Sequence, residues 1–354
     1  MFSYCTSLTA APALPATILA NNCYDSMFEG CRGITTAPAL PVTRLAKYCY
    51  SYMFRNCTGL TQAPTLPATI LVERCYSGMF YGCSKLTAAP KLPATTLADG
   101  CYESMFYGCK TITTAPALPV TRLASYCYDG MFQECENLTT APKLPATTLV
   151  DSCYTFMFSG CSSLTAAPRL PATTLANHCY YGMFEKCTSL TTAPALPVTT
   201  LDDGCYSRMF RGCTNLTQAP ALPATIATNI CYSEMFRDCI ALTTAPALPA
   251  TTLDKHCYAK MFKNCVKLTT IPKLPATTLA ESCYHEMFQG CLKLELNTKR
   301  TALKYTQPYR IPTTGNGTTA LLALTDMFDL TGGLFKGTPS INTTYFLSKN
   351  NTIV

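Results

Sequence analysis

Apolar and polar positions repeat along this chain with a period of 26 residues. One series of cysteines runs from Cys23 to Cys283 and a second from Cys5 to Cys291, both in steps of 26, and together they contain all 23 cysteines. A repeat of this length is typical of solenoids, in which a unit buries its apolar side only by stacking on its neighbours. The periodicity therefore predicts one repetitive architecture rather than several unrelated domains.

The first half of each unit reads C-Y-x-x-M-F-x-x-C. In one copy Cys49, Met53 and Cys57 lie four residues apart, and Tyr50 and Phe54 follow the first two. This spacing places all five side chains on one face of a helix. The pattern predicts a short helix in every unit.

The second half reads L-T-x-A-P-x-L-P-A-T-x-L, with two prolines three residues apart. Proline lacks an N–H and is excluded from central strand ladders, so a strand fits only in the few residues around L-T-x-A. Beyond the first proline we expect an extended chain similar to polyproline II. Threonine recurs from Thr9 to Thr269 and from Thr17 to Thr277, and these ladders predict hydrogen bonds between units or to water.

Together the two halves predict an α/β solenoid. We expect residues 1–294 to form about eleven right-handed 26-residue coils, each a short helix plus a short strand or extended segment. Residues 295–354 lose the cysteines and should form a C-terminal cap with a degenerate repeat, in which Met327 and Phe328 keep their columns and Thr331 takes the place of Cys. Met1 occupies the Met column, so the chain starts inside a repeat without a signal peptide. We expect either a fragment or a neighbouring domain or subunit that covers the N-terminal coil.

The repeated segment M-F-x-G-C-x-x-L-T-x-A-P-x-L-P resembles the BspA-like branch of the leucine-rich repeats, in which A-F-x-x-C-x-x-L precedes L-P. The resemblance covers roughly residues 1–294, and a second proline stands where the family usually has an aliphatic residue. It implies a bacterial surface or secreted protein that adheres to or binds a ligand. It supplies no catalytic residues.

Composition narrows the function classes. Only 13% of the residues are charged and the net charge is +7, which excludes a charge-rich disordered chain and makes nucleic acid an improbable partner. No apolar run approaches the roughly 20 residues of a membrane span.

The cysteines suggest three kinds of chemistry. Disulfides are within reach of neighbouring coils, but an odd total and equivalent backbone sites favour reduced, buried thiols that act as small hydrophobic residues. The chain has no C-x-x-C or Cys-His ligand cluster, so we predict neither a metal nor another cofactor. Cys179 beside His178, or Cys257 beside His256, could form a catalytic Cys-His pair. However, both cysteines belong to a column that recurs in eleven repeats, which packing predicts and a single active site does not. We expect no catalytic residues and no native thiol open to labelling.

Ligand-binding candidates lie in the variable columns. Tyr81 and Tyr107 should stand on adjacent coils with Tyr52 near them, as aromatic anchors for a sugar ring or a protein. The row Arg211, Arg237 and Lys263 is a further candidate, for an anionic polymer. The extended side, with the basic residues Lys91, Lys143 and Arg169 between Pro and Leu, is a candidate concave binding surface.

Two functional classes fit these features. The first is a non-enzymatic extracellular or cell-surface scaffold that binds a surface glycan or a protein. The alternative is a structural or receptor-binding component of a larger assembly such as a phage tail or fibre, which would make the protein virion-associated. The repeats alone do not separate the two.

Overall fold

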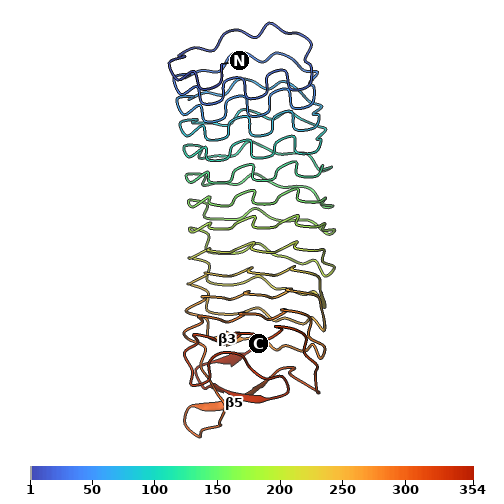
Figure 1. Cartoon of the computed structure of the whole chain (residues 1–354), viewed down its shortest axis with the longest axis vertical. Helices are drawn as coiled ribbons and strands as arrows, with labels where there is room; N and C mark the ends of the chain where they lie inside the picture. Colours follow the sequence, from blue (N-terminus) through green and yellow to red (C-terminus); the bar gives the residue numbers. More distant parts are fainter. Residues whose placement is uncertain (1) are drawn as a thin grey trace. The chain divides into compact units, whose positions relative to one another are not determined.

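A computed structural model of the chain describes residues 2–354, so the position predicted for Met1 lies outside the described residues. The chain divides into two compact units, unit 1 (Met1–Ala172) and unit 2 (Thr173–Val354). Within each unit the backbone winds into successive coils that stack on one another (Figure 1). The predicted solenoid of 26-residue coils is thereby confirmed for each unit.

The predicted short helices are wrong, because the structure has no helix anywhere in residues 2–354. The C-Y-x-x-M-F-x-x-C segments, here called the turn segments, are runs of tight turns. Every fourth residue is left-handed: φ is +56° at Tyr48, +51° at Tyr52 and +57° at Asn56. A left-handed residue at that interval is incompatible with an α-helix. Glycine adopts this conformation without a steric penalty, and Gly78 and Gly82 hold such positions in the next coil.

Backbone hydrogen bonds in the turn segments alternate between two directions. The N–H groups of Tyr50, Tyr52 and Phe54 donate to carbonyl groups of the next coil at 2.8–3.1 Å. The intervening N–H groups, such as those of Ser51 and Met53, donate three residues back within the same coil at 3.2–3.3 Å. Half of the backbone N–H groups therefore bond to the neighbouring coil, whereas in a helix they would bond within the same segment.

The core consists of ladders of identical side chains. In unit 1 each Tyr and Phe of a turn segment stacks on its counterpart in the next coil; Tyr50 and Tyr76 have ring centroids 5.9 Å apart, as do Phe54 and Phe80. From Cys49 onward in unit 1, these side chains and the adjoining Cys and Met are at most 1% exposed. Because one coil cannot cover its own rings, burial of this apolar surface holds the coils together.

The proline-containing half carries little regular structure, as predicted. In unit 1 isolated parallel bridges join Thr36 to Gln62 and Thr114 to Thr140, within L-T-x-A. A second bridge, not anticipated, joins Ile70 to Thr96 beyond the prolines. In unit 2 the same two places carry β1 (Ile226–Ala227), which pairs in parallel with β2 (Thr252–Leu253), and β3 (Thr270–Ile271), which pairs in parallel with β7 (Thr352–Ile353).

The last part of unit 2 combines a degenerate coil with a small sheet. Phe328 stacks on Phe288 with centroids 5.7 Å apart, and Phe288 N–H donates to Met327 O at 3.0 Å, so both residues keep their repeat columns as predicted. Thr331 is 2% exposed and its hydroxyl donates to Phe328 O at 2.9 Å. The remaining strands form an antiparallel sheet in the order β4-β6-β5: β4 (Leu296–Asn297), β6 (Thr344–Ser348) and β5 (Tyr305–Arg310).

Candidate binding face

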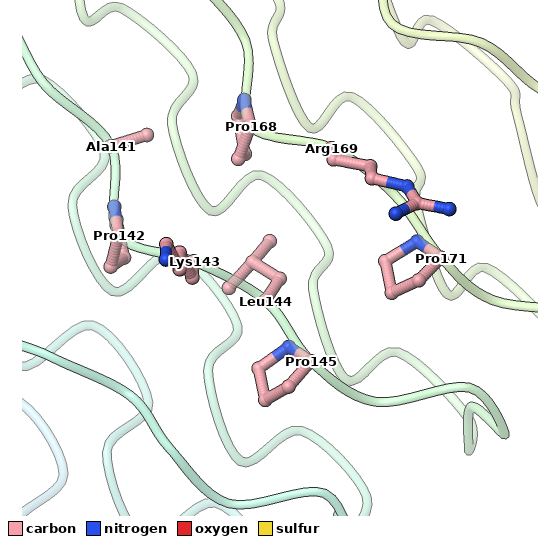
Figure 2. A pocket seen from close by; sticks show the side chains of 8 residues that line it. All are labelled: Ala141, Pro142, Lys143, Leu144, Pro145, Pro168, Arg169 and Pro171. Carbon is pink, nitrogen blue, oxygen red and sulfur yellow. The ribbon is translucent and has the colours of Figure 1, made fainter.

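The A-P-x-L-P segments of unit 1 form a surface with shallow grooves between consecutive coils. We call this surface the proline face and define it by six of the seven A-P-x-L-P segments of unit 1, residues 37–41, 63–67, 89–93, 115–119, 141–145 and 167–171. Four grooves have volumes of about 470–520 Å³ each. Figure 2 shows one of them, lined by one coil and the next: Ala141, Pro142, Lys143, Leu144, Pro145, Pro168, Arg169 and Pro171.

The grooves follow from the chemistry of proline. On one side of the segment Thr139 N–H donates to Thr113 O at 3.0 Å, and on the other side Thr95 N–H donates to Thr69 O at 2.8 Å in its own pair of coils. Between these ladders each coil has two prolines, which cannot donate. Neighbouring coils are therefore not drawn together there by a continuous strand ladder, and the pyrrolidine rings wall the space that remains.

Lys91, Lys143 and Arg169 stand on this face as predicted, and all three are exposed. Lys143 lines two grooves, one on each side of its coil. The ion pairs of unit 1 lie elsewhere, for example between Lys47 and Glu73 at 2.8 Å. Among the described residues, no ion pair includes any of the three cations of the proline face.

The proline-containing half of the repeat has no acidic residue. From the Leu of L-T to the Leu of A-T-x-L, none of the eleven repeats contains Asp or Glu. In unit 1 the same stretches carry five basic residues: Arg44, Lys91, Arg122, Lys143 and Arg169. The proline face is therefore positive with an apolar floor, although the whole chain carries only a modest charge.

A further cavity of about 580 Å³ lies at the corner that follows the proline face. Its polar lining includes Thr95, Thr96, Asp99, Arg122 and Ser125. The Asp99 carboxylate accepts the Ser125 N–H at 3.1 Å. Unlike the proline grooves, this cavity offers hydroxyl, carboxylate and guanidinium groups together.

Tyr52, Tyr81 and Tyr107 come together as predicted, with Arg55 as a fourth member that the sequence analysis missed. The rings of Tyr81 and Tyr107 are parallel and 4.3 Å apart. The Arg55 guanidinium lies 5.2 Å from the Tyr81 centroid and 5.4 Å from that of Tyr52. Tyr81 is thus covered by a ring from the next coil and a cation from the preceding one, so neither of its faces is open for stacking on a sugar.

The basic row Arg211, Arg237 and Lys263 is neutralised by acidic neighbours in unit 2. Arg211 lies 3.4 Å from Glu234, and Arg237 lies 2.8 Å from the same carboxylate. Lys263 pairs with Glu286. Burial pushes the pKa of Glu234 up, but Arg208, Arg237 and Arg211 outweigh it and hold the pKa below its usual value. These cations stabilise a network along the stack rather than present a free positive surface.

The cysteines lie in ladders, and no disulfide joins any of them in the described residues, so the reduced state stays a prediction. Cys57, Cys83 and Cys109 donate through Sγ to phenylalanine carbonyl groups of the preceding coil at 3.0–3.1 Å. Burial raises the pKa of Cys57 to about 12 and that of Cys257 well above its usual value. A thiol with a raised pKa is a poor nucleophile.

Two cysteines contradict the expectation that no native thiol is accessible. Cys5 and Cys23 are exposed, whereas the other cysteines are buried. Both belong to the first turn segments of unit 1, where no preceding described coil covers them.

Threonine side chains form hydrogen bonds between neighbouring coils, as predicted. Thr61 Oγ1 donates to Thr35 O at 3.2 Å and Thr87 Oγ1 to Thr61 O at 3.1 Å.

In the residues from 2 to 354, no group of three or more His, Cys, Asp and Glu side chains could hold a metal ion. The described part of the chain also has no helix able to cross a membrane.

Comparison with known proteins agrees with the repeat pattern. A family model described as BspA type leucine-rich repeat region matches six copies, over residues 1–113, 98–208 and 183–309. No curated protein matches the sequence. Among solved structures, a leucine-rich repeat protein from Bacteroides ovatus ATCC 8483 is similar, with 19% identity and a TM-score of 0.36, over 76% of this chain and 80% of that one.

Proposed function

Because the chain belongs to the BspA-type leucine-rich repeat family, we propose that it is a non-enzymatic scaffold of the bacterial surface that binds a protein ligand on its proline face. Leucine-rich repeat proteins are generally binding scaffolds without catalysis, and BspA-type repeats are typically associated with bacterial surfaces. The observation that carries the choice of face is the combination of apolar grooves with unpaired cations at Lys91, Lys143 and Arg169.

Protein is favoured over glycan on this face because of the groove lining. In the groove of Figure 2, Lys143 and Arg169 are the only lining residues with polar side chains. A sugar needs hydrogen-bonding partners for its hydroxyl groups, since a polar group that loses water without a partner is costly to bury. Apolar side chains of a polypeptide have no such need.

A selection from a random peptide library, run beside a glycan array, tests the proposal with the intact chain. We expect peptides to be selected and their binding to be weakened in the double variant Lys143→Glu, Arg169→Glu. The matched control Arg32→Glu, Lys85→Glu changes the same charge on exposed residues outside the proline face and should bind as the unaltered chain does. Selected peptides that bind both variants equally would contradict the choice of face.

A glycan at the corner cavity is a second candidate, supported by its polar lining of Thr95, Thr96, Asp99 and Arg122. Carboxylate, guanidinium and hydroxyl groups are suitable partners for sugar hydroxyls. A glycan-array signal that Arg122→Ala abolishes, and that Lys143→Glu leaves unchanged, would favour this candidate over the first.

A further inference from the structure

We propose that the partner of the proline face is an extended acidic polypeptide segment that lies across successive coils of unit 1, an inference that rests on the protein-binding function proposed above. Its ligand class follows from three features of the face: the sign of its charge, the chemistry of its floor and the spacing of its coils.

The charge on the face has a single sign. Lys91, Lys143 and Arg169 occupy the same column, in the fourth, sixth and seventh A-P-x-L-P segments of the chain. On the turn side of unit 1, by contrast, several cations are paired: Arg74 lies 2.6 Å from Glu103, and Lys110 lies 2.6 Å from Glu136. The proline-face cations have no such partners in the described structure, and carboxylates of a ligand would supply them.

The floor between the cations is apolar. Pro142, Pro145 and Leu118 line the groove on one side of Lys143, and Leu144, Pro168 and Pro171 line the groove on the other. A ligand that matches this face carries carboxylates and apolar groups in alternation. A polypeptide provides both on separate side chains, whereas an acidic polysaccharide would place unsatisfied hydroxyl groups against proline and leucine.

The coil spacing suits an extended chain. Stacked core rings of consecutive coils in unit 1, such as those of Phe106 and Phe132, have centroids 5.6–6.1 Å apart. Side chains on one side of an extended polypeptide are roughly 6.6 Å apart, because the rise is about 3.3 Å per residue. Lys143 and Arg169 lie on consecutive coils, so two acidic residues on the same side of an extended ligand can reach both cations.

The test uses synthetic peptides of alternating L-glutamate and L-valine, and of alternating L-glutamate and L-serine, with equal length and charge, together with polygalacturonate as an acidic polysaccharide. Binding to the full chain is followed by fluorescence anisotropy at two salt concentrations. We expect the glutamate–valine peptide to bind most tightly and to weaken at high salt. The triple variant Lys91→Ala, Lys143→Ala, Arg169→Ala should weaken it by roughly tenfold, the sum of three exposed ion pairs.

The matched control is the triple variant Arg32→Ala, Lys85→Ala, Lys110→Ala, which removes the same charge from exposed residues away from the proline face. An equal loss in both triple variants would mean that only net charge attracts the peptide and would overturn the inference. Polygalacturonate that binds as tightly as the glutamate–valine peptide would also overturn it, as would no binding at all. Neutral library peptides that depend on Lys143 and Arg169 would still support the proposed function, so the two failures are distinguishable.

Discussion

The ring of Tyr52 lies directly against Gly78 of the next coil. A Cβ added to Gly78 would be 2.2 Å from one ring carbon of Tyr52, a distance that real Cβ contacts do not reach, and Gly78 also has a φ of +57°. The same relationship joins Asn56 to Gly82 and Glu134 to Gly160. A large side chain in a left-handed position is thus accommodated by a glycine in the following coil.

Gly78→Ala should therefore destabilise the protein for two separable reasons. The left-handed backbone alone costs an L-residue about 1–2 kcal/mol, and the clash with Tyr52 adds to this cost unless the ring moves. In the double variant Tyr52→Ala, Gly78→Ala the clash is absent and only the backbone cost remains. A double-mutant cycle on the free energy of unfolding, measured with urea, gives the coupling between the two residues.

Gly108→Ala is the matched control, because Gly108 has a φ of +66° but its nearest neighbour atom would be 3.7 Å from an added Cβ. It should show the backbone cost without the steric cost. If Gly78→Ala and Gly108→Ala destabilise equally, the packing of Tyr52 on Gly78 has no energetic importance.

The left-handed turns explain why the sequence predicted the coils correctly and the helices wrongly. Residues at i, i+4 and i+8, such as Cys49, Met53 and Cys57, fit a helix and a series of four-residue turns almost equally, because the helical face drifts by only about 80° over eight residues. The sequence did contain a signal against a helix. Gly78 and Gly82 lie four residues apart, and Gly100 occupies the repeat column four positions before that of Gly78. Glycine repeated at that interval disfavours a helix and favours left-handed positions.

The candidate site was predictable in part for a similar reason. The position between Pro and Leu holds basic residues and no acidic ones, which the sequence shows directly, so Lys91, Lys143 and Arg169 could be predicted as candidates. The grooves beside them depend on how pyrrolidine rings of two coils face each other, which no single repeat reveals. The contact of Arg55 with Tyr81 and the pairing of Arg211 with Glu234 likewise depend on the register of neighbouring coils.

Phe106→Ala should destabilise unit 1 much more than Tyr107→Ala. Phe106 is 0% exposed and stacks between Phe80 and Phe132 at 5.7 and 5.6 Å, so its truncation leaves a cavity that costs about 3–5 kcal/mol. Tyr107 is partly exposed and contacts chiefly Tyr81. Chemical denaturation of both variants measures the difference. Equal losses would mean that the inner and outer columns are assigned wrongly.

Thiol labelling should separate two classes of cysteine. A maleimide reagent should modify two thiols in the native protein, Cys5 and Cys23, because the others are buried. After denaturation without reductant it should modify all 23. Burial raises the pKa of Cys49 to about 12, so the inner thiols lack the reactive thiolate as well as access.

The double variant Cys5→Ser, Cys23→Ser is the control and should show no native labelling. A denatured count well below 23 would mean that disulfides replace the reduced ladders. Rapid native labelling of many thiols in the double variant would instead mean that the stacked coils open readily.

Asp129 should make the stability of the protein fall as the pH rises from about 4 to about 7. Burial, helped by the negative charge of Glu103 and partly opposed by Arg74, raises the pKa of this carboxyl to about 7. An unfolded Asp has a pKa of about 3.9. Between these values the folded chain keeps a proton that the unfolded chain has lost, so each step up in pH favours unfolding until Asp129 ionises in the folded state as well.

Asp129→Asn should remove this part of the pH dependence, because the amide does not titrate. Free energies of unfolding from urea titrations across that pH range test the prediction, and the difference between variant and unaltered chain isolates Asp129 from the histidines. Asp25→Asn, in the same column but exposed, is the matched substitution whose pH profile is compared with that of Asp129→Asn. A slope that survives Asp129→Asn would place the titrating group elsewhere, with Glu103 the next residue to replace, since burial raises its pKa while Arg74 opposes the shift.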